Sequence, residues 1–447
     1  MKIGTGRLVV VFVLGSVLVL CDLPGEAGAQ EIEFASSPNP VGSGARALGM
    51  GGAFIAMADD ATAASWNPGG LIQLERPEVS VVGAWFHRTE DNTFGGHPES
   101  DGSQSVSDGS LNYLSAAYPF TMFDRNMIVA LTYQHLYDFN RSWQFDYHYL
   151  NRESDLFLDL DVDYQQDGGL SALGLSYAVQ VIPALSLGVT VNIWDDGLGG
   201  NSWTQDASLS GYSRFGPYFL GESYRRVDEY TFDGINFNVG FLWRISESLT
   251  LGGVFKTPFT ADIEHEASLD RRTVLLGTFW PSVQDDSERG KYDEEMDMPA
   301  SYGIGVAYRF SDQLTASFDL YRTEWGDMIY TDAKGRKFSA ISSVDEDRSD
   351  IDATVQARAG VEYLLIRPKY LIPLRAGIFY DPAPAEESSD NLYGIALGTG
   401  FAMGWYIVDV GYQYRFGSDV GSAIFKTGEL AQDVEEHTLY ASLIVHF

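Results

Sequence analysis

Apolar side chains recur at every second position over long stretches of this chain. In SYGIGVAYRF (301–310), large apolar residues hold the even positions, and small or polar residues hold most of the odd ones. The stretches ALSLGVTVNIW (184–194) and WYIVDVGYQYRF (405–416) repeat the pattern. A period of two predicts strands with one apolar and one polar face. After the first thirty residues, no apolar run reaches the roughly eighteen residues that a membrane-spanning helix needs.

Strands of this kind are expected throughout residues 76–447. The pattern predicts fourteen of them, an even number. They are expected near 76–90, 109–120, 126–138, 168–182, 184–195, 230–245, 248–260, 299–310, 313–326, 351–365, 369–381, 392–403, 405–416 and 436–447.

The links between these strands alternate between short and long. Single residues or pairs such as Ser311-Asp312 alternate with long links at 139–167, 196–229, 261–298 and 327–350. Outer-membrane barrels have short periplasmic turns and long extracellular loops, whereas a soluble sandwich has no reason to sort its links by length. We therefore predict an all-β fold: a transmembrane antiparallel β-barrel of about fourteen strands, multi-pass in a Gram-negative type of cell outer membrane.

The first residues have the composition of a secretory signal peptide. Lys2 and Arg7 flank the start of an apolar run at 8–20, and Ala27-Gly28-Ala29 is a small-residue cleavage site. We expect residues 1–29 to be removed. Cys21 is the only cysteine and follows Leu20 rather than a small residue, which disfavours the alternative of a lipid anchor. No disulfide framework is then available to the exported protein.

The net charge of −33 argues against nucleic acid as a partner, because such binding neutralises phosphates. Carboxylates gather in the long links, as expected where charge is excluded from a lipid-facing band. Asp159, Asp161 and Asp163 share one strand face and could bind Ca²⁺, but an acidic extracellular rim is favoured because the EF-hand glycine is missing. Divalent ions bridging such a rim to lipopolysaccharide are a further alternative, so we assign no metal site.

Residues 30–75 precede the first strand and are rich in glycine and alanine. A fourteen-stranded lumen is too wide for its own side chains to fill, so a compact plug, or hatch, is expected inside it. Small residues permit close packing and tight turns there. Residues that could latch or gate the hatch share polar, glycine or proline chemistry in the run 44–71: Gly44, Arg46, Gly52, Asp59, Asp60, Asn67 and Pro68. A purely structural role for them is the stronger alternative.

The same run resembles the hatch of the FadL-type (OMPP1/FadL/TodX) outer-membrane transporters of hydrophobic compounds. The similarity includes Ala58-Asp59-Asp60-Ala61, Trp66-Asn67-Pro68 and the strand opening Arg76-Pro77, and it returns at 298–325, 374–384 and 408–417. It implies a fourteen-stranded barrel with a hatch at its periplasmic end. It also implies capture of hydrophobic molecules in an apolar pocket above the hatch, and release by hatch movement, often sideways into the bilayer. The third strand lacks an internal Gly or Pro, so a kink for lateral release cannot be read from it.

We therefore expect passive uptake of long-chain fatty acids or similar lipids and hydrocarbons. The alternative is an interaction role, as a cargo-holding barrel of a protein-secretion system. An adhesin or porin-like role for the acidic links is a third possibility. A fatty-acid-like ligand requires an apolar pocket with one or two cations that bind its carboxylate. Candidate ligand-binding residues are the hatch aromatics and strand cations: Phe34, Phe54, Trp66, Arg244, Lys256 and Arg309.

An enzyme is disfavoured because the scattered histidines form no H-E-x-x-H, and no G-x-S-x-G elbow occurs. We expect no cofactor. The expected partners are the hydrophobic ligand, outer-membrane lipid or lipopolysaccharide, and the barrel assembly machinery, which recognises last strands that end on an aromatic residue such as Phe447. We expect the protein to be a monomer.

Overall fold

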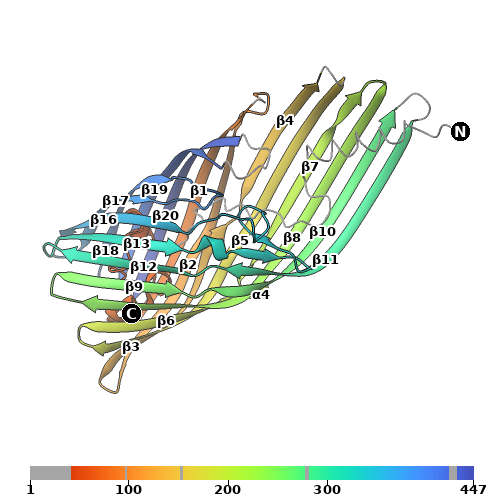
Figure 1. Cartoon of the computed structure of the whole chain (residues 1–447). Helices are drawn as coiled ribbons and strands as arrows, with labels where there is room; N and C mark the ends of the chain where they lie inside the picture. The colour runs from red at the N-terminus through yellow and green to blue at the C-terminus, as the bar shows by residue number, and fades with distance from the viewer. Residues whose placement is uncertain (1–41, 96–97, 152–154, 277–280, 422–429) are drawn as a thin grey trace.

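A closed antiparallel sheet forms the body of the protein (Figure 1). The computed structural model describes residues 42–95, 98–151, 155–276, 281–421 and 430–447. The sheet closes because β1 pairs with both β2 and β20. Fourteen strands make the closed wall. In order around it they are β1 (Glu78–Phe94), β2 (Gly102–Met122), β3 (Arg125–Asp138), β5 (Leu156–Ile182), β6 (Leu185–Trp194), β8 (Tyr218–Arg244), β9 (Leu249–Lys256), β12 (Ser301–Arg309), β13 (Leu314–Thr323), β16 (Thr354–Ile366), β17 (Leu371–Tyr380), β18 (Tyr393–Met403), β19 (Tyr406–Val420) and β20 (Leu430–His446).

The alternation in the sequence corresponds to the two faces of this wall. On β12 the large apolar residues point outward: Tyr302 is 41% exposed, Ile304 49%, Val306 39% and Tyr308 44%. A soluble protein buries such a face, whereas a barrel in a bilayer turns it to lipid. The fourteen-strand membrane barrel predicted from the sequence is confirmed.

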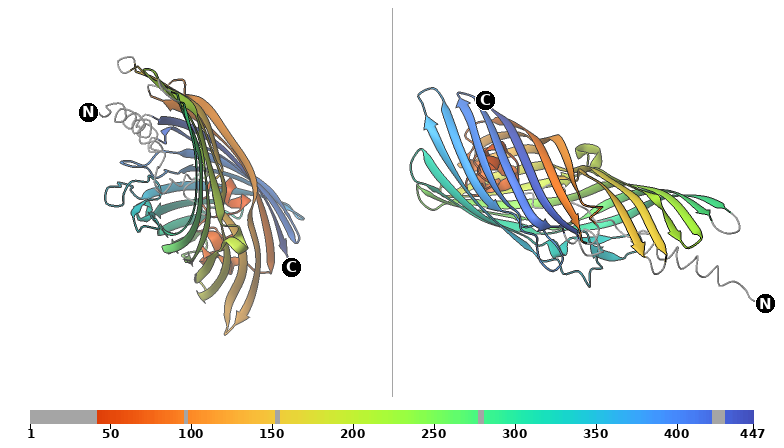
Figure 2. Two further views of the ribbon diagram at one scale, coloured as in Figure 1. Left: turned by 90° about the vertical axis from the view of Figure 1, so that its right-hand side faces the viewer. Right: turned by 90° about the horizontal axis from the view of Figure 1, so that it is seen from above.

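Three of the four long links are not loops, and that prediction was wrong. They continue the sheet beyond the wall, where β5 and β8 are much longer than predicted. The added strands are β4 (Arg141–Asn151), β7 (Ser202–Phe215), β10 (Phe259–Leu276) and β11 (Ser282–Met298). Residues 324–353, in and around the fourth link, hold a 3₁₀ turn and a small hairpin, η2 (Trp325–Asp327), β14 (Ile329–Thr331) and β15 (Lys337–Ser339). Figure 2 shows the extended sheet projecting past one side of the barrel.

The extension carries charged residues on its outward face, and for this reason its sequence resembles that of loops. The outward positions of β10 include Asp262, Glu264 and Glu266, all exposed, while the alternate Ala261, Ile263 and His265 are buried. Charged side chains are costly against lipid but not in water. The extension therefore lies outside the membrane, where a strand needs only one apolar face.

The described segment before β1, residues 42–77, folds inside the barrel ring (Figure 2). It contains two short helices and a 3₁₀ turn: α2 (Ala45–Gly49), α3 (Ala63–Trp66) and η1 (Pro68–Gln73). A further short helix, α4 (Asp196–Gly199), follows β6. Within the described ranges, every helix falls short of the length and apolarity needed to cross a membrane. We call residues 42–75, the described part of the expected hatch, the hatch from here on.

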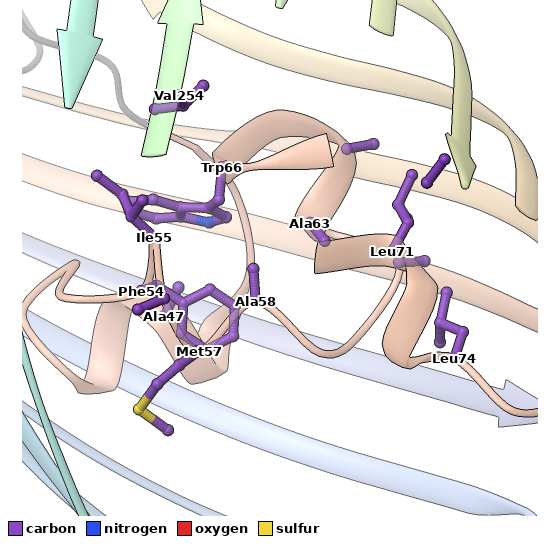
Figure 3. Packing of buried hydrophobic residues seen from close by; sticks show 14 of the residues in the cluster. Ala47, Phe54, Ile55, Met57, Ala58, Ala63, Trp66, Leu71, Leu74 and Val254 are labelled. Atoms are coloured by element: carbon purple, nitrogen blue, oxygen red, sulfur yellow. The ribbon is translucent and has the colours of Figure 1, made fainter. Parts of the chain in front are cut away.

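The hatch shares an apolar core with wall residues such as Val254 and Tyr321, built mainly from alanines around a few large side chains (Figure 3). Phe54 and Ile55 are fully buried, and Trp66 is 3% exposed. The rings of Phe54 and Trp66 meet edge to face, with centroids 5.9 Å apart. Because the hatch buries its own aromatics, it is a folded element and not an extended tail in the lumen.

Glycines of the wall receive the hatch backbone. A Cβ on Gly360 or Gly377 would lie 2.3 Å from backbone atoms of Met50, and one on Gly188 would lie 2.3 Å from the carbonyl group of Pro68. No heavy atom tolerates such a distance, so any larger residue at these positions would push the hatch away from the wall. The glycines of β6, β16 and β17 thus let the hatch backbone pack directly against the wall backbone.

A single charge on the outward face should separate lipid-facing from water-facing strands. We expect Ile304→Arg, in the middle of β12, to destabilise the barrel in bilayers by about 2–4 kcal/mol. Glu264→Arg on the outward face of β10 is the control and should change the free energy of unfolding by less than about 0.5 kcal/mol. Urea unfolding from lipid vesicles measures both, and equal effects of the two changes would contradict the placement of the membrane.

Candidate functional site

Asn67 fastens the hatch to itself and to the wall. Its side-chain amide donates to the carbonyl oxygens of Ile55 and of Phe241 on β8, both at 2.8 Å. Its Oδ1 accepts from the backbone N–H of Gly69 at 3.1 Å, which caps the turn that Pro68 begins. The side chain is fully buried. One residue therefore holds three backbone groups from two parts of the hatch and from one wall strand.

Wall side chains bind the hatch at further backbone groups. Asp319 on β13 accepts from the N–H groups of Phe54 at 2.6 Å and Ile55 at 2.8 Å. On β6, Ser186 donates to Gly69 at 2.7 Å and Thr190 donates to Ala64 at 2.9 Å. Sequence reasoning missed these three wall residues, since a polar residue on an inward strand face has no local signature of what it binds.

Arg46 joins the hatch to an ion-pair chain in the wall. Its guanidinium binds both oxygens of Glu362, at 3.0 and 2.9 Å, and also contacts Asp59 within the hatch. Arg375 binds Glu362 at 2.7 Å and Asp409 at 2.6 Å. The carboxylates of Glu362 and Asp409 are buried and each has a guanidinium partner. Charge-assisted bidentate pairs of this kind fix orientation as well as contributing energy.

Asp60 lies in a second acidic patch at the base of the hatch. It is 7% exposed and accepts from the N–H and hydroxyl of Thr62. Glu78, at the start of β1, accepts from the N–H of Ala61 at 2.8 Å and lies 3.1 Å from Nε2 of His446. Burial, and next the negative charge of Glu78, raise the pKa of Asp60 to about 7. The hatch thus contains a carboxyl group that titrates near neutral pH.

A cavity of about 140 Å³ lies against the hatch. The hatch contributes Trp66 and glycines that include the predicted Gly44 and Gly52, both at positive φ. The wall contributes residues of seven strands and of the turn that follows β17: Ala84, Trp85, Phe86, Ser110, Asn112, His135, Leu136, Asp138, Arg358, Phe379, Asp381, Gln413, Glu436, Thr438 and Tyr440.

The cavity reaches the wall at the place where the backbone pairing between β2 and β3 ends. Their backbone pairing runs from Met122 only as far as Tyr113, opposite Gln134. Beyond it, Asn112 Nδ2 still donates to the carbonyl oxygen of His135 at 3.3 Å. The pairing of β3 with β5 also shifts register between His135 and Tyr137. Trp85, on β1 opposite Gly109 of β2, lines the cavity although it is 44% exposed, so the cavity approaches the outer surface beside this part of β2.

The bulge at residue 136 could not be read from the sequence. Breaks in strands are expected at Gly or Pro, and β3 has neither. Here the extra residue is Leu136, which leaves the ladder and lines the cavity. Any residue can occupy a bulge whose backbone stays in an allowed region.

An aromatic cluster lies next to the cavity and includes residues of β7 and β10. Leu136 and Tyr137 pack against it from β3. Trp203 stacks on Tyr230, with centroids 4.7 Å apart. The cluster is covered by residues of η2, β14 and the segment around β15. Its aromatic members are Phe139, Trp194, Trp203, Tyr230, Phe232, Trp325, Tyr330 and Phe338.

The candidate ligand-binding residues are dispersed. Trp66 alone among them lines the cavity, while Phe54 belongs to the hatch core. Lys256 is half-buried, with Nζ 6.0 Å from the ring centroid of Tyr321. Phe34 lies outside the described residues.

The expectation that Arg244 and Arg309 are lumen cations was wrong. Both are exposed at strand ends next to short turns, away from the cavity. Strand alternation predicts which face of a strand a residue occupies, but it does not predict the position of that residue along the barrel axis. The cation that does line the cavity is Arg358, which sequence reasoning missed.

The carboxylates considered for calcium are on the outer face of β5. Asp161 lies opposite Asp146 of β4, and Asp159 lies 3.0 Å from Nδ1 of His148. In the part of the chain that the structure describes, no group of three or more acidic, histidine or cysteine side chains is arranged as a metal site. The acidic rim stays a prediction.

Removing the Asn67 side chain should loosen the hatch without opening the wall. Asn67→Ala loses three buried hydrogen bonds, so we expect hatch docking to weaken by about 2–4 kcal/mol. Limited proteolysis in detergent should cut the hatch of this variant, while the barrel keeps its heat-modifiable migration on gels. Gln73→Ala, which loses one bond to Ala58, is the matched control. Hatch protection equal to wild type in Asn67→Ala would contradict the latch.

The raised pKa of Asp60 makes docking depend on pH. Below about pH 4 the group is neutral whether or not the hatch is docked, so it adds no pH dependence there. Between that value and about 7 the undocked group ionises first, so docking weakens as the pH rises and is weakest above 7. Hatch proteolysis should therefore be faster at pH 8 than at pH 5, and Asp60→Asn should remove most of the difference. A difference that persists in Asp60→Asn would contradict this role.

The comparisons with known proteins agree with this architecture. A family profile described as "Outer membrane protein transport protein (OMPP1/FadL/TodX)" matches residues 26–439. The fold is similar to that of a Pseudomonas aeruginosa FadL homologue, with a TM-score of 0.60, 13% identity, and coverage of 91% of this chain and 98% of that one. It is also similar to the P. putida toluene transporter TodX, with a TM-score of 0.58, 13% identity, and coverage of 92% and 99%.

The CymD monoaromatic hydrocarbon channel is a third similar structure. Its TM-score is 0.55 at 16% identity, with coverage of 92% of this chain and 98% of that one. No protein with a curated functional description matches the sequence. The family match confirms the expected resemblance, the outer-membrane location and a non-enzymatic channel for hydrophobic compounds, without fixing the compound. The chain belongs to the OMPP1/FadL/TodX family of outer membrane transport proteins.

Proposed function

We propose that this protein carries a small hydrophobic molecule passively across the outer membrane. The molecule enters past the extracellular aromatic cluster and rests in the cavity against the hatch. It leaves through the gap between β2 and β3 into the bilayer, when the hatch shifts. The observation that supports this route is a single cavity that touches the hatch, the aromatic cluster through Leu136, and the outer wall at Trp85.

The size of the cavity favours a compact ligand body. A volume of about 140 Å³ is close to the roughly 150 Å³ cavity that holds one benzene molecule in an engineered protein core. The similar structures named above include a toluene transporter and a monoaromatic hydrocarbon channel. We therefore rank ring-sized compounds first, and a long-chain fatty acid second because its tail would have to extend beyond the cavity.

We also propose the division of the chain that this route needs. Residues 1–29 are a removed signal peptide, residues 30–75 form the hatch, and residues 76–447 form the barrel. The described hatch residues support the second boundary, because β1 begins at Glu78.

Uptake by cells tests the proposal. Cells that produce the full chain should take up labelled toluene or labelled fatty acid faster than cells with an empty vector. If uptake is unchanged for every hydrophobic ligand and the protein co-purifies with secretion components, transport is wrong and a cargo-holding role is supported.

Narrowing the wall gap should slow release. Ser110 lines the cavity at the gap, so Ser110→Trp should lower uptake several-fold while leaving the barrel folded. Ser105→Trp places the same bulk on an exposed part of β2 outside the cavity and is the control. Equal uptake by the two variants would contradict lateral release at this gap.

A further inference from the structure

One short segment, residues 328–340, covers the aromatic cluster beside the cavity. It contains β14 and β15, and its Met328, Tyr330 and Phe338 pack on the cluster. Cluster members from the sheet, such as Trp203 and Phe232, are buried. A molecule that passes this cluster on its way to the cavity therefore has to displace what covers it.

The covering segment joins the sheet along a short seam. β14 pairs with β11 over three residues of each strand. Glu294 of β11 adds two hydrogen bonds, since it accepts from the hydroxyl of Tyr330 at 2.5 Å and from the N–H of Ala333 at 3.3 Å. One buried carboxylate therefore binds the segment through both a side chain and the backbone.

Both ends of the segment are fastened away from this seam. Before it, Nε1 of Trp325 donates to the hydroxyl of Thr354 at 3.0 Å. After it, the N–H of Asp350 donates to Glu386 at 2.6 Å. Neither bond involves β11, so the segment can leave β11 while its two ends stay in place.

His265, on β10 of the sheet extension, lies between Glu294 and a second carboxylate. Its Nδ1 is 2.9 Å from Glu294, and its Nε2 is 2.8 Å from Asp228 of β8. A neutral imidazole has one N–H and can donate to one of them, whereas the doubly protonated ring donates to both. Arg226 binds Asp228 at 2.6 and 2.8 Å. All four side chains are buried, and their two cations balance two carboxylates when His265 is protonated at both nitrogens.

The other titratable groups that face His265 are tyrosines. Tyr230 of β8 stacks on it with centroids 4.3 Å apart, and Tyr292 of β11 lies at 5.5 Å. Burial lowers the pKa of His265, but the hydrogen bonds to Asp228 and Glu294 outweigh burial and raise the pKa above its ordinary value of about 6.5. Lifting the segment lets water screen the carboxylates, so the pKa falls back toward that value. Closure is thus strongest below about pH 6.5 and weakens as the pH rises through the raised pKa.

We infer that residues 328–340 are a lid on the aromatic cluster, which His265 holds closed at low pH and releases as the pH rises. Loss of a proton from His265 leaves Arg226 as one cation against two buried carboxylates. An uncompensated buried charge is costly, and lifting the lid returns Glu294 to water. The inference rests on the proposed function for what the lid admits, a hydrophobic molecule that travels past the cluster to the cavity.

Hydrogen exchange of the purified full chain in detergent tests the lid. Exchange is expressed as protection factors, so that the pH dependence of the intrinsic rate cancels. Amides of residues 328–340 should lose protection several-fold between pH 6 and pH 9. Tyr330→Phe keeps the ring but loses the bond to Glu294, so it should lower lid protection at pH 6 and flatten the pH profile. His265→Gln cannot take up the proton and should also give a flat profile.

His148→Gln is the matched control. It removes an exposed histidine of the same sheet extension that lies 3.0 Å from the carboxylate of Asp159, and it should keep the wild-type profile. Lid protection that does not change with pH in wild type would overturn the inference, as would a wild-type profile in His265→Gln. Should His265→Gln not fold, Tyr330→Phe decides, because it leaves the ion cluster intact.

Uptake of labelled toluene at pH 6 separates the lid from the proposed function. Cells that produce Tyr330→Phe should take up toluene faster than cells with the wild-type chain, because their lid is looser at the same pH. Equal uptake by a variant with an unprotected lid would overturn the role of the lid as an entrance. If the lid responds to pH as expected but the wild-type chain takes up no hydrophobic compound, the proposed function is wrong and the pH-dependent lid stands.

Discussion

The rest of the structure depends on the volume of the barrel lumen. Fourteen strands enclose a lumen that their own inward side chains cannot fill, and a wall of this width without a plug would be an open pore. The hatch solves the problem by direct contact of backbone with backbone, since wall glycines such as Gly188 and Gly360 leave no room for a side chain. The latch at Asn67, the ion pairs of Arg46 and the cavity beside Trp66 all require this close approach.

Hydrogen bonds and ion pairs fix the position of the hatch in the barrel. Apolar packing joins the hatch to the wall, but it is not directional. Orientation comes from buried side chains of the wall that accept or donate to hatch backbone, Asp319 and Thr190 among them, and from the pairing of Arg46 with Glu362. Asp60 differs from these groups because burial and the negative charge of Glu78 disfavour its ionised form, so its charge opposes docking where theirs supports it.

Much of the fold could be predicted from the sequence because period-two alternation is a direct consequence of a lipid-facing wall. The sheet extension could not be predicted, because its strands face water where the wall strands face lipid. Exposed charges such as Glu264 then make the sequence resemble that of a loop. The turn at Asn67 and Pro68 could be predicted from the sequence, whereas a latching role for Asn67 stays a prediction. That Arg358 lines the cavity could not be predicted, because this depends on its height in the barrel, which is not encoded locally.

Electrical recordings test the central claim, that the docked hatch closes the barrel while a hydrophobic ligand passes sideways. The purified full chain is inserted into planar bilayers, and single-channel conductance is measured beside the uptake of labelled toluene by cells. We expect no steady ion conductance from a protein that nevertheless speeds uptake. A steady open-pore conductance in the wild-type protein would contradict it, because ligand could then travel straight through the lumen.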